Sequence, residues 1–334
     1  MRPRLLISAG NDLFRSFFSA DHQNRLSRTF DWQTDGARQT TAGFRQMLAR
    51  SEALITTWDS PEFDRGLTQL APKLRMVAHC GGEVKRRFAS PLFTRLTITN
   101  APKPMAQATA ELGAAFLTYC ARDVDRYREA LRKPSSKIYS EAHTLGTDES
   151  LYGREVGMIG FGRVGRALVD LMRGFELSWV VYDPYAPREL SRDYPVVFTK
   201  LEPLLRRSHL LVLTAALTDR TRGLLDQKAL ARLPDGAVVI NIARGGLVDL
   251  PALTKEVRRR RLRCALDVTD PAEPLPIRHP LRKLPGAILT PHVAGGGRHV
   301  RGEIASTVIE DLERFFRGQA VKNRVTAAML KRMT

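Results

Sequence analysis

Cysteine is scarce in this chain, and no long hydrophobic run occurs in it. Three cysteines lie among 334 residues at wide, unpatterned spacings, namely Cys80, Cys120 and Cys264. This pattern excludes a disulfide framework and a cysteine metal site, and it predicts a reduced, cytoplasmic protein without a metal. No apolar run approaches the roughly 18–20 residues of a membrane-spanning helix, so no membrane partner is expected. The stretch Leu5–Ala9 is too short for a signal-peptide core and favours a first β-strand.

Acidic residues are in deficit. The chain has 53 Lys and Arg against 35 Asp and Glu, which gives a formal net charge of +18. Such an excess favours either a nucleic-acid or anionic-membrane partner or an arginine-rich surface that attracts anionic substrates. The densest cluster, Arg258–Arg261, ends a predicted helix, where cations interact favourably with the helix dipole. Because no known nucleic-acid-binding motif accompanies the cluster, nucleic-acid binding is not expected.

From about Glu155, short apolar segments alternate with amphipathic segments. The apolar segments are typical of strands buried on both faces of a parallel sheet, and they are Val156–Ile159, Val180–Tyr182, Leu210–Leu213, Val238–Asn241, Cys264–Val268 and Ile288–Thr290. One predicted helix is Arg163–Phe175, whose apolar face is expected to contain Leu168, Leu171, Met172 and Phe175. Six strands that alternate with helices predict a doubly wound parallel α/β sheet.

A second, looser alternation covers the first hundred residues. Its predicted strands are Leu5–Ala9, Ala53–Thr56, Met76–Ala78 and Leu96–Thr99. After Gly297 a helix returns, with an apolar stripe formed by Ile304, Val308, Ile309 and Leu312. We therefore predict a smaller flavodoxin-like domain made of residues 1–102 and 298–334, into which a second doubly wound domain, residues 103–297, is inserted. Gly and Pro residues near both crossings suit a hinge.

The segment Gly160-Phe161-Gly162-Arg163-Val164-Gly165 follows a predicted strand and opens a predicted helix. Gly160 permits a tight turn, Gly162 lets the backbone approach a pyrophosphate, and Gly165 allows close helix–strand packing. The helix N-terminus offers free N–H groups to the phosphates. Asp183 ends the next strand, where a carboxylate binds the adenosine ribose hydroxyls and repels a 2′-phosphate. The pattern predicts a Rossmann domain that binds NAD rather than NADP.

Three further polar side chains follow successive strands of the predicted sheet, namely Arg244, Glu273 and His292. Ligands of open α/β sheets bind outside the carboxyl ends of the strands, so these side chains are expected to converge beside the nicotinamide. A guanidinium holds the carboxylate and carbonyl of a 2-keto acid in one orientation. Reduction leaves an alkoxide that a histidine protonates, and a carboxylate orients and stabilises the imidazolium. Together they predict hydride transfer at C2 of a small 2-hydroxy/2-keto acid.

These motifs resemble those of the D-isomer-specific 2-hydroxyacid dehydrogenase family. The resemblance runs from roughly Leu151 to Gly318, and more loosely over the first 150 residues. It includes the Gly-rich loop and the segments around Arg244, Asp267–Leu275 and His292. It implies an NAD-dependent oxidoreductase, a cofactor domain inserted into a split substrate domain, a homodimer formed through the cofactor domain, and no metal.

The resemblance also implies roles for individual residues. Arg244 would orient the substrate, His292 would be the acid/base and Glu273 its partner, while Asp267 would hold the nicotinamide carboxamide. The implied cofactor contacts are Gly160, Gly162, Arg163, Val164, Gly165, Asp183, Thr214, Ile242, Ala243, Arg244, Asp267, His292, Ala294 and Gly295. The implied substrate contacts are Gly81, Gly82, Arg244 and His292.

The chain departs from the family pattern at three places. The substrate loop is His79-Cys80-Gly81-Gly82-Glu83-Val84, where the family usually has G-x-G-x-D, and Leu112 replaces a usual histidine. One additional residue precedes Glu273, so Asp270 is an alternative partner for the histidine. The family usually has Gln in place of this glutamate in its formate dehydrogenases, which disfavours formate. Two alternatives stay open, namely a phosphite- or aldehyde-type substrate and a corepressor-like protein that binds NAD without turnover.

Overall fold

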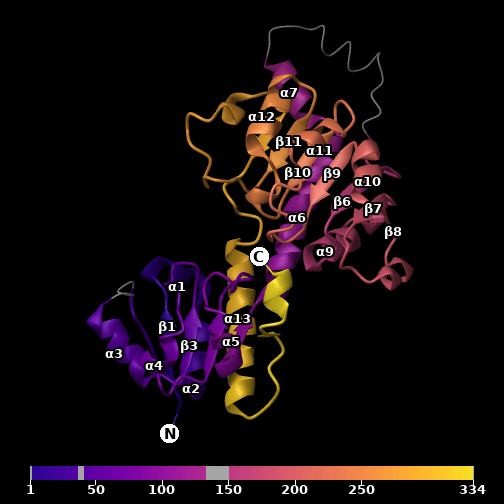
Figure 1. Cartoon of the computed structure of the whole chain (residues 1–334). Helices are drawn as coiled ribbons and strands as arrows, with labels where there is room; N and C mark the ends of the chain where they lie inside the picture. The colour runs from indigo at the N-terminus through magenta and orange to yellow at the C-terminus, as the bar shows by residue number, and fades with distance from the viewer. Residues whose placement is uncertain (1, 37–40, 133–149, 334) are drawn as a thin grey trace. The chain divides into compact units, whose positions relative to one another are not determined.

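The computed structural model of the chain describes residues 2–36, 41–132 and 150–333. Its contacts divide the chain into two compact units. Unit 1 is Met1–Met105 together with Gly295–Thr334, and unit 2 is Ala106–Ala294. The yellow C-terminal helix α13 (Arg298–Phe316) thus belongs to the same unit as the indigo N-terminal strands (Figure 1). Each unit has its own sheet and its own core.

Unit 1 contains a six-stranded sheet in the order β13-β5-β4-β3-β1-β2. Its strands are β1 (Arg4–Ser8), β2 (Asp31–Thr34), β3 (Ala53–Thr56), β4 (Met76–His79), β5 (Thr97–Asn100) and β13 (Arg324–Val325). The pairs among β1 to β5 are all parallel, whereas β13 is antiparallel to β5. The order 2-1-3-4-5 of the parallel strands is that of the flavodoxin-like fold, which confirms the prediction.

Helices cover both faces of this sheet. Residues of β1 alternate between the two faces, so Leu5 and Ile7 belong to one apolar cluster and Leu6 to the other. The first cluster contains residues of α1 (Asn11–Phe17), α2 (Ala20–Thr29) and α13. The second contains residues of α3 (Ala42–Arg50), α4 (Leu67–Leu70) and α5 (Leu92–Arg95). The predicted stripe of α13 is confirmed, because its four residues are all buried.

Unit 2 contains a seven-stranded, wholly parallel sheet in the order β12-β11-β10-β9-β6-β7-β8. Its strands are β6 (Glu155–Ile159), β7 (Ser178–Tyr182), β8 (Val196–Phe198), β9 (Leu210–Leu213), β10 (Val238–Asn241), β11 (Arg263–Leu266) and β12 (Ala287–Leu289). This is the Rossmann order with one strand added after the sixth, which confirms the predicted doubly wound fold.

Helices also cover both faces of the second sheet. Residues of α6 (Pro102–Ala121) and α9 (Arg163–Leu171) pack in one apolar cluster. Residues of α10 (Leu201–Arg207), α11 (Gln227–Ala231) and α12 (Leu250–Arg258) pack in the other. The remaining helices of the described residues are α7 (Val124–Leu131) and the 3₁₀ segments Arg173–Phe175, Arg188–Arg192, Gly245–Leu247, Pro280–Lys283 and, in unit 1, Met329–Arg332.

Three local predictions are corrected by the structure. The edge strands β2 and β8 were not expected, because β2 (DWQT) lacks an apolar run and β8 (VVF) is only three residues long; both are partly exposed, and Val197 of β8 is 66% exposed. The helix predicted over Arg163–Phe175 ends at Leu171, and a 3₁₀ turn follows it. Leu171 is 43% exposed and so does not belong to the buried face, which contains Leu168 and Met172.

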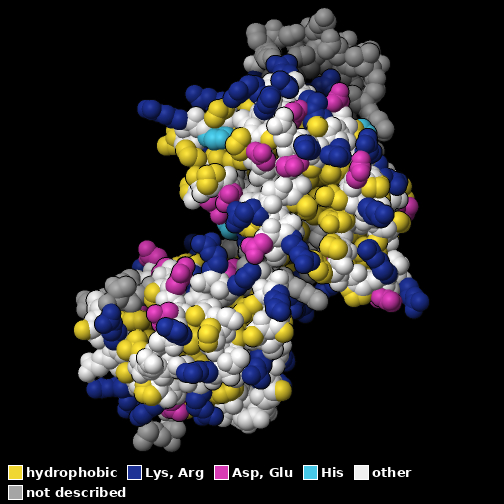
Figure 2. Space-filling model, viewed as in Figure 1, with side chains coloured by type: hydrophobic (Ala, Val, Ile, Leu, Met, Phe, Trp, Pro, Cys, Tyr) yellow, Lys and Arg dark blue, Asp and Glu magenta, His cyan; other side chains and the backbone are white. Residues whose placement is uncertain are grey.

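Two surface properties bear on partners. Within residues 2–36, 41–132 and 150–333, no helix is both long enough and apolar enough to cross a membrane. Figure 2 shows Lys and Arg side chains spread over the visible face of each unit, with Asp and Glu side chains among them. In the cluster Arg258–Arg261, Arg261 forms ion pairs with Glu256 and Asp235 and also donates hydrogen bonds to two backbone carbonyls. Part of that cluster therefore holds the end of α12 in place.

Candidate active site

The turn after β6 requires glycine at its first position. Gly160 has φ +92°, in the left-handed region that favours glycine. A Cβ atom there would lie 2.5 Å from the Cα atom of Ala215, so no side chain fits. Thr214 Oγ1 donates a hydrogen bond to the Gly160 carbonyl at 2.5 Å, which fixes the turn from the neighbouring strand β9. The predicted residues Gly160 and Thr214 therefore lie together.

The N-terminus of α9 is open. Gly162 is its N-cap residue, no side chain caps the helix, and, apart from its chain neighbours, no residue has an atom within 4 Å of the position a Gly162 Cβ would occupy. Arg163 is exposed and Val164 half-buried. At Gly165 a Cβ would meet the Gly160 carbonyl oxygen at 2.9 Å, so glycine allows the close helix–strand packing. Uncapped N–H groups facing open space fit a dinucleotide pyrophosphate.

Asp183 follows β7 and lies beside the glycine turn. Its Oδ2 accepts a hydrogen bond from the Phe161 backbone N–H at 2.7 Å. Its Oδ1 accepts bonds from the N–H groups of Tyr185 at 2.8 Å and Ala186 at 3.1 Å. The carboxylate is therefore held in one orientation at the edge of the turn. Oδ2 keeps a second lone pair for a ligand hydroxyl.

The segment after β10 positions Arg244. Asn241 Oδ1 accepts a bond from the Ala243 N–H at 3.0 Å, and its Nδ2 donates to the Arg244 carbonyl at 3.0 Å. The Arg244 side chain is half-buried, and its Nη1 donates to the Ala243 carbonyl at 2.7 Å. The next position, Gly245, must be glycine because a Cβ there would overlap the backbone of Thr269. The role of Asn241 was not predicted, although it belongs to the motif that identified Arg244.

Asp267, after β11, organises the segment that follows β12. Its Oδ1 accepts bonds from Thr290 Oγ1 at 2.5 Å and from the Val293 N–H at 2.9 Å, and its Oδ2 accepts one from the Ala294 N–H at 3.0 Å. Its carbonyl accepts the His292 N–H at 2.8 Å. The side chain is 1% exposed. A buried carboxylate with three donors holds His292 at a left-handed φ of +55°.

His292 and Glu273 form a direct pair. His292 Nδ1 lies 2.7 Å from Glu273 Oε2, while Glu273 Oε1 accepts a bond from the Thr269 N–H at 3.2 Å. The alternative partner, Asp270, instead lies 3.8 Å from Arg222. The imidazole is 45% exposed, and no hydrogen bond of the described chain engages its Nε2 atom. Of the two carboxylates considered from the sequence, the structure pairs Glu273 with the histidine.

The substrate loop of unit 1 contains successive backbone N–H groups that make no hydrogen bond within the described chain. The Gly81 N–H donates to the His79 carbonyl at 2.8 Å, which makes a tight turn. Within the described part of the chain, no hydrogen bond engages the backbone N–H groups of Gly82, Glu83 and Val84. Asn100 Nδ2 holds the Gly82 carbonyl at 2.7 Å. Gly82 and Glu83 are half-buried whereas Val84 is buried, so the first two N–H groups fit a carboxylate, even though the sequence departs from the family pattern.

The buried side chain of His79 packs against this loop. Its imidazole is 2% exposed and lies 2.9 Å from Thr56 Oγ1. Burial, aided by the Arg87 cation, lowers the pKa of His79 to about 3. A Cβ at Gly81 would lie 2.5 Å from the His79 Nε2 atom, so the ring sits directly against the loop. The sequence places His79 at the start of the substrate loop, but it does not indicate that the imidazole is buried.

The remaining predicted residues lie near these groups or at the unit boundary. Ile242 and Ala243 are buried at 3% and 9% exposure, directly after β10. Ala294 is buried, and Gly295 is the first residue of the returning part of unit 1. No three His, Cys, Asp or Glu residues of the described chain gather as a metal-binding group. The absence of a metal and the homodimer stay predictions.

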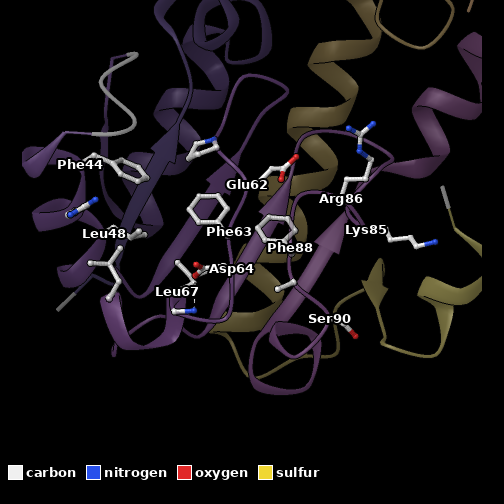
Figure 3. A pocket seen from close by; sticks show the side chains of 15 residues that line it. Phe44, Leu48, Glu62, Phe63, Asp64, Leu67, Lys85, Arg86, Phe88 and Ser90 are labelled. Atoms are coloured by element: carbon white, nitrogen blue, oxygen red, sulfur yellow. Dashed lines mark hydrogen bonds between the residues drawn. The ribbon is translucent and has the colours of Figure 1, made fainter. Parts of the chain in front are cut away.

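A cavity of about 660 Å³ lies elsewhere in unit 1. It is lined by residues of α3, α4 and the segments 61–64 and 85–90. Figure 3 shows the rings of Phe63 and Phe88 side by side on its wall, with their centroids 5.6 Å apart. The lining includes neither Gly81 nor Gly82, so this cavity is separate from the substrate loop.

Comparisons with known proteins bear on the function of this arrangement. Residues 114–294 match the sequence model described as D-isomer specific 2-hydroxyacid dehydrogenase, NAD binding domain. Glyoxylate reductases of Pyrococcus horikoshii and Korarchaeum cryptofilum are 33% and 31% identical to this chain, and each alignment covers 84% of both proteins. The solved structure of a phosphoglycerate oxidoreductase from Rhizobium etli is 26% identical, with a TM-score of 0.77, and the match covers 97% of this chain and 98% of that one.

Proposed function

Because the chain belongs to the D-isomer-specific 2-hydroxyacid dehydrogenase family, we propose that it reduces the C2 carbonyl of a small 2-keto acid, with His292 as the proton donor. NAD is its cofactor. The observation that carries the assignment of His292 is its 2.7 Å contact with Glu273, which leaves the opposite ring nitrogen open. The substrate class is supported by the relatives named glyoxylate reductase.

The residues around the glycine turn fit the cofactor. The uncapped N–H groups of α9 would bind the pyrophosphate, and the open space beside Gly162 leaves room for it. Asp183 Oδ2 would accept a bond from one adenosine ribose hydroxyl. A phosphate on that ribose would meet the same carboxylate, which favours NAD. When bound, NADH supplies the hydride that reduces the C2 carbon.

His292 would supply the proton. Reduction of the carbonyl places negative charge on the C2 oxygen, and the Nε2–H of a protonated imidazole would pass its proton there. Glu273 accepts the Nδ1–H, so its charge stabilises the imidazolium before transfer and fixes the ring orientation throughout. In the reverse direction the neutral ring takes the hydroxyl proton. The chemistry therefore requires both members of the pair.

Arg244 would bind the carboxylate end of the substrate. The guanidinium is the group that holds a carboxylate and an adjacent carbonyl together. Its Nη1 contact with Ala243 and the support of Asn241 restrict it to few orientations. In unit 1, the N–H groups of Gly82 and Glu83 offer further donors to a carboxylate.

NADH oxidation with glyoxylate, hydroxypyruvate, pyruvate and bulkier 2-keto acids tests the proposal. We expect turnover with at least one of them. His292→Gln should lower kcat by about 10²- to 10⁴-fold, as loss of a general acid does, while the Kd for NADH stays unchanged. The matched control is His299→Gln, because His299 also lies beside a glutamate, Glu303 at 3.3 Å, but is 90% exposed on α13.

Two results would overturn the assignment. Wild-type turnover in His292→Gln would remove the proton-donor role. NADH binding without oxidation by any 2-keto acid would instead favour a corepressor-like protein, in which the dinucleotide acts only as a conformational ligand. A gel shift with nucleic acid that disappears at high salt would support that second function.

A further inference from the structure

An aromatic pair lies at the carboxyl edge of the sheet in unit 1. The strand order reverses between β1 and β3, and open α/β sheets bind ligands in the crevice at such a point. Trp58 follows β3, and Phe17 ends α1, which follows β1. Their rings meet edge to face at 5.1 Å. The partly buried indole of Trp58 thus packs on the buried ring of Phe17 near the point where the strand order reverses.

Trp58 spans the distance between the substrate loop and the start of α13. A Cβ at Gly81 would lie 3.0 Å from its Nε1 atom. A Cβ at Gly296 would lie 3.1 Å from its Cη2 atom, at the opposite end of the indole. Glycine at both positions therefore leaves space for the ring. Arg87 Nη2 also donates to the Trp58 carbonyl at 3.1 Å, which fixes the backbone that carries the indole.

Arg301, in the first turn of α13, is stacked on these two rings. Its guanidinium carbon lies 5.0 Å from the Trp58 ring centroid and 5.8 Å from that of Phe17. Its Nε donates to the Gly296 carbonyl at 2.9 Å. The side chain is half-buried, so stacking and one hydrogen bond hold it in place. Its position is set by the same residues that border the substrate loop.

The guanidinium lacks an anionic partner. No carboxylate of the described chain lies within 4.0 Å of it, and no hydrogen bond engages its two Nη atoms. Arg25, also half-buried in this unit, has both carboxylate oxygens of Glu313 at 2.8 Å. The nearby Asp59 already accepts bonds from Gly10 and Thr57. A fixed, half-desolvated cation with two free nitrogens is suited to an anionic ligand.

We propose that Arg301 selects 2-keto acids that carry a second anionic group, a carboxylate or a phosphate, at the end remote from the keto acid. The proposal rests on the proposed function and specifies the substrate class of that site. The loop donors beside Gly81 bind the first carboxylate, and the indole of Trp58 leads from that loop to Arg301. Arg301 is then a specificity-determining residue, whereas proton transfer stays with His292.

Matched substrate pairs test this selection. The carboxylate pair is 2-oxoglutarate against 2-oxopentanoate, and the phosphate pair is phosphohydroxypyruvate against hydroxypyruvate. We expect the wild type to have the higher kcat/KM for the dianionic member of at least one pair. Arg301→Met keeps an unbranched stem over Trp58 and should lower that value by about 10- to 100-fold, with less than about a threefold effect on the monoanionic member. The control is Arg298→Met, at an exposed position on the same helix.

The outcomes separate the two proposals. An equal fall for both members of each pair would show that Arg301 only supports the fold, and an unchanged preference would remove its role while the dehydrogenase assignment stands. No turnover with any 2-keto acid would refute the proposed function. Calorimetric binding of glutarate and pentanoate to the NADH-loaded protein gives a readout without turnover. Equal affinity for the two, or equal affinity of wild type and Arg301→Met for glutarate, overturns the selection.

Discussion

The buried imidazole of His79 makes the stability of unit 1 sensitive to acid. We consider His79→Asn, because the amide of asparagine can occupy the place of Nδ1 and keep the contact with Thr56, now 2.9 Å. The asparagine cannot become charged. A comparison of wild type and variant across pH therefore isolates the cost of protonating the imidazole from the cost of changing its shape.

The magnitude follows from the two ionisation states. In the folded protein burial lowers the pKa of His79 from 6.5 to about 3, so above pH 3 the folded state binds fewer protons than the unfolded state. Stability is fully present above the unfolded value and is lost as the pH falls from about 6.5 towards 3. Between about pH 7 and about pH 5, this loss amounts to about 2 kcal/mol of unfolding free energy.

Urea unfolding at several pH values measures this difference. Trp32 and Trp58 belong to unit 1 and report on its unfolding by fluorescence. We expect the wild type to lose about 2 kcal/mol more than His79→Asn over that interval. His209→Asn, at an exposed position in unit 2, should leave the pH dependence unchanged. Parallel pH profiles for wild type and His79→Asn would refute the reasoning, since they would mean that the folded state tolerates a charged imidazole.

Three further predictions concern the cofactor turn and the thiols. Gly160→Ala should abolish NADH binding, measured by fluorescence titration, because its φ is +92° and the added Cβ would lie 2.5 Å from Ala215; the backbone alone costs about 1–2 kcal/mol, so unchanged affinity would contradict the turn geometry. Asp183→Asn removes the negative charge and should narrow the preference for NADH over NADPH by about tenfold in kcat/KM; an unchanged ratio would mean that another group excludes the phosphate. Burial raises the pKa of the thiols of Cys80, Cys120 and Cys264. A disulfide reagent should therefore react with them only after unfolding, and fast labelling of the native protein would disprove their burial.

The sequence predicts those parts of the fold that depend on continuous burial. Strands such as Leu210–Leu213 and Val238–Asn241 are buried on both faces, so their apolar runs are unbroken and their bounds were predicted correctly. β2, with the sequence DWQT, and β8 lie at sheet edges and face solvent on part of their surface. β2 lacks an apolar run and β8 is only three residues long, so neither carries a comparable signal.

Some features of the candidate site can likewise be predicted from the sequence, and others cannot. The positions of Glu273 and His292 after successive strands are visible in the sequence, and their 2.7 Å contact is a geometry that the sheet topology favours. The choice of Glu273 over Asp270 depends on the path of a loop, which spacing alone leaves open. Trp58 and Arg301 are separated by 243 positions in the sequence numbering, and no motif links them. Only the return of α13 to the first sheet brings them together.

The carboxylate of Asp267 fixes the position of His292 in a way that depends little on which side chains surround it. Backbone groups, not neighbouring side chains, satisfy most of its acceptor sites, so the path of residues 292–294 is specified by main-chain donors that every residue except proline provides. Val293 is 49% exposed and is free to vary without moving the imidazole beside it. A lineage could thus remodel the surface around its proton donor many times while the donor itself stayed where it was.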